Sequence, residues 1–397
     1  MNASKFFLIA LLLGVAITPA LLAHGGDDDD DDDNGVDSIP SVVVRITNLS
    51  PSRGTFLTPV WIGLHDGTFD SYDGGEAASV PLGGNEIEAL AEDGNTGPIS
   101  DTFSTLTGDA PQATVPGPAG PLAPGESRAI TLNVDPLDNR YFSYASMIIP
   151  SNDAFVANGN PLAHMLFDDD GEFVGEGFLV SGDESNDAGT EVNDEIASNV
   201  AFLAQGGPNI GDDEDGVVVT PHPGFAAPGD LAYPDGILNY PVFANSAISE
   251  AGDRLLGVEF RYVDFGDRVR FRSSLSPDQE VQGERVDSEG SGVARLRSKD
   301  GNELRVRINF DDLTGDLIAA HLHLGAPGTN GPVIVDLEEG IRSRSVRITV
   351  DEDDLTGPLA GADFLTFLNE LAAGNVYINL HTAEFPAGEI RGQVDLK

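Results

Sequence analysis

The sequence contains no cysteine and only three lysines among 397 residues. Without cysteine there is no disulfide framework and no thiol for a lipid anchor. Its domains must therefore be held together by hydrophobic packing or by bound ions. The hydrophobic content of 40% is high enough to build such cores, and the length allows two or three domains.

Familiar catalytic motifs are also absent from the sequence. There is no Gly-x-Ser-x-Gly elbow, no phosphate-binding loop, no His-Glu-x-x-His and no dinucleotide fingerprint. Acidic pairs are so frequent that none of them indicates glycosidase chemistry. We therefore expect a protein that is not an enzyme.

Positive charge is scarce and unevenly distributed, and the formal net charge is -45. Nucleic acid and anionic membranes would be repelled, whereas cations and cationic surfaces would be attracted. No Lys or Arg occurs from residue 141 to residue 252, but arginines are frequent from Arg254 onward. This asymmetry predicts two modules, residues 41–252 and residues 253–397.

The N-terminus combines Lys5, an apolar run over residues 6–17 and small residues at Ala20 and Ala23. This pattern predicts a signal peptide at residues 1–23 and a secreted protein, extracellular or periplasmic. The run is shorter than the roughly 20 residues of a membrane span, so we expect no membrane insertion of the mature protein. A retained N-terminal anchor is the alternative. Residues 24–40 contain seven consecutive aspartates and are expected to form an extended linker.

Short apolar stretches separated by Gly and Pro predict an all-β fold. Strands are expected at residues 41–47, 59–65, 127–134, 141–149, 217–220, 333–337, 345–350 and 376–381. Residues 292–297 and 304–310 alternate around Asp300-Gly301 and predict an antiparallel hairpin. Helices are expected at residues 86–92 and 362–373. The result is two β-sandwich-like modules, the second with one short helix.

Three motifs in the last third of the chain resemble the CHRD domain found in secreted proteins. They are Phe-Arg-Ser-Ser-Leu-Ser-Pro at 271–277, Ala-His-Leu-His-Leu-Gly-Ala-Pro-Gly at 320–328, and Gly-Asn-Val-Tyr-Ile-Asn-Leu-His-Thr at 374–382. Their order and spacing cover the whole second module.

Residues 41–252 resemble a bacterial spondin-type N-terminal domain. The resemblance rests on short pieces at residues 47–51, 59–67, 75–79, 91–94, 145–155 and 187–191. It implies a C2-like β-sandwich that binds glycans or receptors and holds a calcium ion.

The same resemblance implies which acidic residues would hold calcium. Asp153 and Asp187 match the family's motifs, and Asp135 is the nearest acid upstream for a third ligand. Calcium requires 6–8 oxygen ligands, and the surrounding chain supplies no Lys or Arg to neutralise them. The alternative is that these aspartates only cap turns.

Three histidines form a second candidate site. His321 and His323 are two residues apart and share a face of one expected strand, while His381 lies on another strand. Three imidazoles can provide an open zinc or copper site. Alternatively, these histidines are buried and hydrogen-bonded to the backbone, Asn379 or Glu389.

Together these features predict a secreted, non-catalytic binding or matrix protein, supported by calcium, whose partners are extracellular glycans or cell-surface proteins. One alternative is a purely structural spacer of the envelope or matrix. Another is a metal-dependent extracellular enzyme that uses the three histidines.

Overall fold

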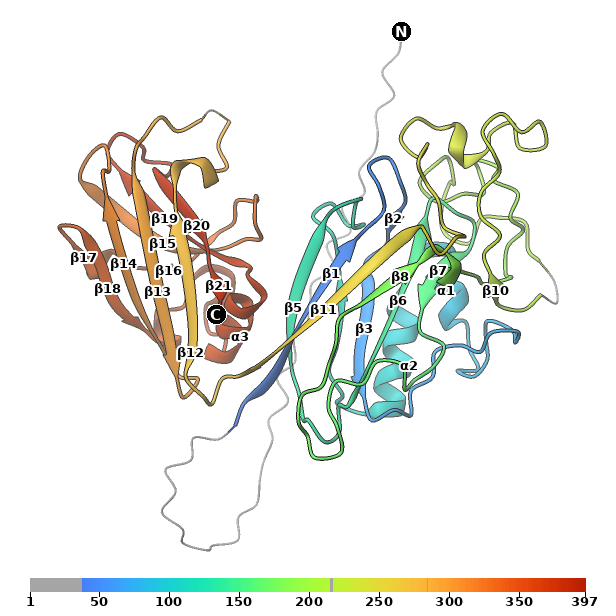
Figure 1. Ribbon diagram of the computed structural model, residues 1–397, viewed down its shortest axis with the longest axis horizontal. Helices are drawn as coiled ribbons and strands as arrows, with labels where there is room; N and C mark the ends of the chain where they lie inside the picture. The colour runs from blue at the N-terminus through green and yellow to red at the C-terminus, as the bar shows by residue number, and fades with distance from the viewer. Residues whose placement is uncertain (1–37, 215–216, 284) are drawn as a thin grey trace, which may run out of the picture. The chain divides into compact units, whose positions relative to one another are not determined.

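The computed structural model describes residues 38–214, 217–283 and 285–397. The expected signal peptide at 1–23, and the linker as far as residue 37, lie outside the described residues. The predicted all-β fold is confirmed, and the described residues form four sheets and three α-helices (Figure 1). None of the described helices is both long and apolar enough to cross a membrane.

The first module, residues 38–264, is built on two antiparallel sheets. The four-stranded sheet runs β5 (Ser127–Asn133), β1 (Pro40–Asn48), β11 (Arg254–Asp264) and β8 (Phe178–Ser181). The larger sheet runs β10 (Thr220–Pro221), β9 (Asn186–Asp187), β7 (Ala154–Ala157), β6 (Tyr141–Ile149), β3 (Val60–His65) and β4 (Gln112–Val115), and β2 (Phe56–Leu57) pairs with β6. Val44, Ile62 and Phe142 belong to the core between the sheets.

Strand β11 corrects the predicted boundary between the modules. It pairs along its length with β1, from Pro40 opposite Asp264 to Asn48 opposite Leu256. The arginine-rich part of the sequence begins inside this strand. The change in charge along the sequence therefore comes before the boundary between the two modules. The first module therefore continues to Asp264, twelve residues beyond the predicted end at 252.

Strands β3 and β6 are buried on both faces, which explains why their sequences lack alternation. On the face away from the sandwich core, Trp61 packs against Phe103 of α2 (Gly97–Thr107), with ring centroids 5.2 Å apart. The helix predicted at 86–92 is confirmed as α1 (Glu86–Asp93). Helix α2 was not predicted, because its Ser and Thr residues are weak helix formers and burial of Ile99 and Phe103 stabilises it.

The second module, residues 265–397, also contains two antiparallel sheets. The larger runs β17 (Ile341–Arg342), β18 (Ser345–Val350), β14 (Glu303–Asp311), β13 (Ser291–Lys299), β12 (Val269–Leu275) and β21 (Asp395–Leu396). The smaller runs β16 (Val333–Asp336), β15 (Leu317–Leu324), β19 (Val376–Thr382) and β20 (Ile390–Gln393). Alternate residues of both, among them Ile308, Leu322 and Ile378, fill one core.

Local sequence accounts for the hairpin and the helix of the second module. Asp300 and Gly301 both have positive φ, 65° and 68°, and they lie in the three-residue turn, residues 300–302, that joins β13 and β14 at the expected place. Helix α3 (Phe364–Ala373) begins at Asp363, whose carboxylate accepts a hydrogen bond from Thr366 N at 2.7 Å. It ends at Gly374, which adopts a left-handed conformation.

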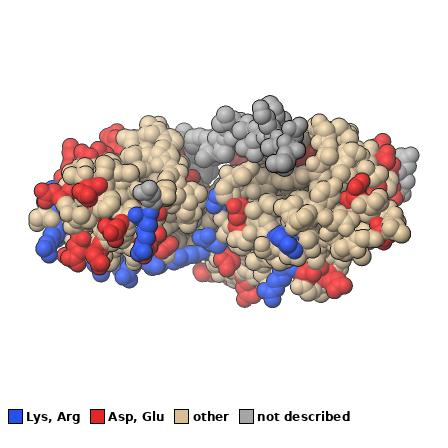
Figure 2. Space-filling model, turned by 90° about the horizontal axis from the view of Figure 1, so that it is seen from above, with Lys and Arg blue, Asp and Glu red and all other residues tan. Residues whose placement is uncertain are grey.

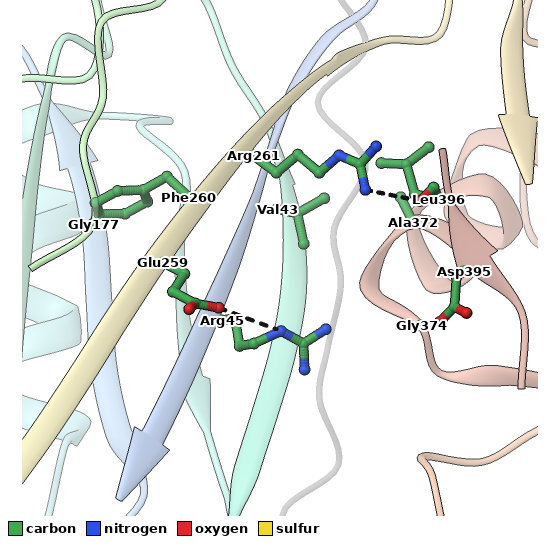
Figure 3. Close-up of a pocket in the computed structure, with 10 residues that line it drawn as sticks. All are labelled: Val43, Arg45, Gly177, Glu259, Phe260, Arg261, Ala372, Gly374, Asp395 and Leu396. Carbon is green, nitrogen blue, oxygen red and sulfur yellow. Dashed lines mark hydrogen bonds and ion pairs between the residues drawn. The ribbon is translucent and has the colours of Figure 1, made fainter. Parts of the chain in front are cut away.

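The two modules differ in surface charge. The second carries 14 of the chain's 21 Lys and Arg residues and 23 of its 66 acidic residues, and Figure 2 shows both kinds interspersed on the lobe at left. The described residues of the first module form two ion pairs, each with an exposed carboxylate. One joins Arg45 on β1 to Glu259, its direct neighbour on β11, with 4.0 Å between Nε and Oε2 (Figure 3). Such exposed pairs contribute little to stability.

Candidate metal centres

Asp153 lies immediately before β7, and its side chain is completely buried. One carboxylate oxygen, Oδ2, accepts hydrogen bonds from Thr190 N at 2.9 Å, Thr190 Oγ1 at 3.2 Å and Glu191 N at 3.1 Å. The other oxygen, Oδ1, is buried and has no hydrogen-bond partner among the described residues. A buried carboxylate oxygen without a partner is costly, so this atom is a candidate cation ligand.

Asp187 ends β9 and pairs with Ala154, which brings it beside Asp153. Its Oδ1 accepts a hydrogen bond from Gly189 N at 2.8 Å, and its Oδ2 accepts one from the Asn193 amide. Asp153 and Asp187 therefore lie side by side, and each carboxylate also caps the turn at residues 187–191, as the alternative supposed.

Two buried glutamates lie beside these aspartates, although the sequence did not predict them as metal ligands. Glu92, on α1, is 3% exposed, and Glu191 is 2% exposed with a buried Oε2 that has no partner in the described parts of the chain. Both stand in motifs already noted, Ala-Glu-Asp-Gly and Asp-Ala-Gly-Thr-Glu, but they come from a helix and a loop far apart in sequence. We call Glu92, Asp153, Asp187 and Glu191 the acidic cluster.

Burial and the charges of neighbouring acids raise the pKa of three members of the acidic cluster, Glu92, Asp153 and Glu191. Burial, followed by the nearby Asp187, raises the pKa of Asp153 to about 6. Burial and neighbouring acids raise the pKa of Glu92 to about 7 and that of Glu191 to about 8. No Lys or Arg lies between Arg140 and Arg254, so the nearby chain supplies no permanent positive charge. Protons or a bound cation must neutralise the cluster.

Asp135 does not belong to this site, and the prediction that it supplies a third ligand is wrong. It is exposed and lies between β5 and β6, where its Oδ1 accepts a hydrogen bond from Leu137 N at 2.9 Å. Asp153 follows the other end of β6, and nine residues of strand span about 30 Å. The nearest acid in sequence is therefore separated from the site by the length of the strand.

A cavity of about 270 Å³ adjoins the acidic cluster. Its lining includes Asn193, which binds Asp187, and Asn152, which precedes Asp153. His222 also lines it and accepts a hydrogen bond at Nδ1 from Gly224 N at 3.0 Å, so its Nε2 carries the proton. That buried Nε2 has no partner among the described residues. Phe225 and Tyr233 contribute aromatic rings to the same lining.

The three histidines lie on one face of the smaller sheet of the second module, and we call them the histidine cluster. His321 and His323 are on β15 and His381 is on β19, with Leu322 between the first two pointing into the core. His321 Nδ1 is 3.3 Å from His381 Nε2. One ring nitrogen from each histidine falls within 4.8 Å of the other two.

Backbone carbonyls fix two of the three imidazoles. His323 Nδ1 lies 3.0 Å from Gly331 O, and His381 Nδ1 lies 3.1 Å from Pro386 O. A carbonyl only accepts, so both Nδ1 atoms donate and both Nε2 atoms present lone pairs. The expected alternative partner Glu389 instead accepts hydrogen bonds from Ser288, Thr314 and Thr382. Hydrogen bonds from the imidazoles to the backbone are present, as that alternative supposed.

The two clusters differ in how closely their ligand atoms approach. In the described residues, the ligand atoms of the three histidines lie within 4.8 Å of one another, and so do those of His321, Asp336 and Glu338. No three carboxylates of the acidic cluster approach one another this closely in the same part of the chain. An ion in the acidic cluster would therefore need water or carbonyl ligands as well.

Comparison with known families bears on the second module. Residues 271–394 match the CHRD domain family. The chain contains a CHRD domain. This domain includes both strands of the histidine cluster, so the resemblance noted in the sequence is confirmed for that region. No curated protein matches the chain.

Proposed function

We propose that the chain is a secreted, non-catalytic binding protein whose first module holds calcium next to a ligand cavity. The observation that carries this proposal is the buried Oδ1 of Asp153, which has no hydrogen-bond partner among the described residues and belongs to the acidic cluster. Calcium prefers carboxylate, carbonyl and water oxygens and tolerates irregular geometry, which suits this donor set.

Asp153 Oδ1 and Glu191 Oε2 would be the principal protein ligands, because both are buried without a partner in the described structure. Asp187 would contribute charge while its oxygens remain bonded to Gly189 N and to the Asn193 amide. A calcium ion would neutralise the carboxylates and release the protons that they hold. The ion would thus stabilise the loop that carries residues 187–193.

The cavity indicates where a partner would bind. Asn152 and Asn193 connect it to the acidic cluster, and Phe225 and Tyr233 offer aromatic surface beside amide and imidazole groups. Apolar walls with a few directed polar groups are typical of ligand sites. This combination suits a sugar ring of an extracellular glycan, or a side chain of a cell-surface protein. Calcium would support binding by ordering Asn193.

The proposal is tested by thermal unfolding of the purified chain in chelator and in saturating calcium. Calcium should raise the unfolding temperature of the wild type, because a ligand bound only to the folded state stabilises it. Asp153→Asn should abolish the increase, while the exposed Asp109→Asn should preserve it. An identical unfolding temperature with calcium and with chelator would reject the calcium site.

Binding is then separated from a purely structural role with a glycan array and a pull-down from envelope material, each with calcium and with chelator. The proposal expects calcium-dependent retention that is lost in Tyr233→Ala but kept in Asp109→Asn. A spacer would give no retention under either condition.

A further inference from the structure

We propose that His321, His323 and His381 form a binding site for a divalent transition-metal ion, zinc or copper, on the outer face of the CHRD sheet. The site is independent of the calcium proposal, since it lies in the other module and uses nitrogen rather than oxygen ligands. Imidazole nitrogens suit zinc and copper, whereas calcium prefers oxygen.

The backbone geometry brings the three nitrogens together. In the pairing of β15 with β19, His321 lies opposite Asn379 and Ala319 opposite His381, so His381 is diagonal to His321 on the same face. The resulting contact places His321 Nδ1 3.3 Å from His381 Nε2. The Nε2 of His323 is buried and has no hydrogen-bond partner among the described residues.

Each imidazole has an oxygen near the nitrogen that would not bind the metal. For His323 and His381 these oxygens are the carbonyls of Gly331 and Pro386, at 3.0 and 3.1 Å. For His321 it is the Glu338 carboxylate, with 4.0 Å between Nε2 and Oε1. Metal-binding histidines characteristically donate their second N–H to such a carbonyl or carboxylate, which orients the ring.

Without a metal, two nitrogen lone pairs of the histidine cluster have few hydrogen-bond donors or none. His381 Nε2 can accept only the proton of His321 Nδ1, and the lone pair of His323 Nε2 is unsatisfied within the described residues. A metal ion would replace the His321 Nδ1 proton, which moves to Nε2 and faces Glu338. All three ligands would then be neutral imidazoles with their remaining N–H groups directed at oxygen.

Aromatic packing holds the His323 ring in place. The ring of Tyr377 stacks on His323 with centroids 4.7 Å apart, and Arg391 lies 3.5 Å from the Tyr377 centroid. Three protein ligands leave coordination positions for water, as in open zinc sites.

The test uses the untagged full chain after treatment with chelator, with calcium present at saturation so that the acidic cluster is occupied. Titration with zinc should show a site that His323→Gln and His381→Gln each weaken by more than about 100-fold, beyond the effect of losing an outer partner. His164→Gln, which removes a histidine from the first module, should leave zinc affinity unchanged. Circular dichroism checks that each variant is folded.

Copper provides a spectroscopic measurement of the ligands. Copper(II) bound to a His24→Gln background, which removes the one further histidine near the N-terminus, should show electron paramagnetic resonance couplings from imidazole nitrogens that are lost in His323→Gln. If His381→Gln does not fold, His321→Gln carries the test, because that side chain is 19% exposed. Zinc affinity that is unchanged in the folded histidine variants, or a copper spectrum without nitrogen couplings, would overturn the proposal.

Discussion

Glu191 of the acidic cluster and His323 of the histidine cluster both lose contact with solvent on folding, but burial shifts their pKa values in opposite directions. It raises the pKa of Glu191 to about 8 and lowers the pKa of His323 to about 4. In both cases the uncharged form is favoured, because transfer of a charge out of water is costly.

The consequence for metal binding differs between the two clusters. A neutral carboxylic acid is a poor ligand and must lose its proton before calcium binds, so calcium competes with protons near neutral pH. A neutral imidazole is already the ligand form. Burial therefore opposes calcium binding at the acidic cluster but favours the metal-binding form of His323 in the histidine cluster.

The largest expected effect is the loss of calcium stabilisation in the acidic cluster. At a calcium concentration 100 times the dissociation constant, a single site stabilises the folded state by about 2.7 kcal/mol. Asp153→Asn should remove this increment. In chelator the same variant should be at least as stable as the wild type, since Asn keeps an acceptor for Thr190 and Glu191 and removes a repelled charge.

Chemical denaturation with calcium and with chelator measures both effects, and His323→Gln serves as the matched variant in the other cluster. His323→Gln should gain the same free energy of unfolding from calcium as the wild type does. If Asp153→Asn still gained stability from calcium, Asp153 would not be a calcium ligand.

The second prediction concerns the pH dependence of stability in chelator. Because the folded-state pKa values of Glu92 and Glu191 are raised from 4.5 to about 7 and about 8, the folded protein binds these protons more tightly than the unfolded chain. Their contribution is complete below pH 4.5 and is lost as pH rises through 7 and 8. The depressed pKa of His323 acts in the opposite sense, and its contribution is lost as pH falls from 6.5 towards 4.

Denaturation between pH 7 and pH 8.5 isolates the acidic contribution, since the His323 imidazole is then largely neutral in both the folded and the unfolded chain. Glu191→Gln should flatten the decline in the free energy of unfolding over this range, and calcium should flatten it in the wild type. A wild-type protein without calcium that became more stable from pH 7 to pH 8.5 would contradict the raised carboxylate pKa values.

The sequence predicted strands and turns better than it predicted which residues from distant parts of the chain come together. Apolar stretches and turn residues predicted strand β6 and the hairpin at Asp300-Gly301. The alternation of side chains along a strand predicted that His321 and His323 share one face. The strand expected at 217–220 is reduced to Thr220–Pro221. Glu92 was missed because nothing local shows that α1 packs beside the loop that carries Glu191.

The outer partners of the histidines were missed for a related reason. Gly331 and Pro386 contribute only backbone carbonyls, which every residue possesses, so no residue type marks them. Their role depends on where two loops return across the sheet. The structure was needed to show that the tautomers of His323 and His381 are fixed.

The third prediction concerns the carboxylate near His321. Glu338→Gln keeps the size of the side chain but removes the charge that faces Nε2 at 4.0 Å. Loss of such an outer partner weakens metal binding by about 10-fold to 100-fold, and the exposed position of Glu338 places the expected value at the lower end. Zinc titration should show this loss, while the adjacent exposed Glu339→Gln should bind zinc like the wild type. Equal affinities for both variants would remove Glu338 from the site.

The smallest expected effect belongs to Asp135, which tests whether position in the fold or proximity in sequence selects the calcium ligands. Asp135→Asn retains an oxygen that can accept the hydrogen bond from Leu137 N, and the side chain is exposed, so stability should change by less than about 0.5 kcal/mol. The calcium-induced rise in unfolding temperature should equal that of the wild type, whereas Asp187→Asn should reduce it. Because Asp135 and Asp153 flank opposite ends of β6, a reduced calcium response in Asp135→Asn would require a second ion far from the acidic cluster.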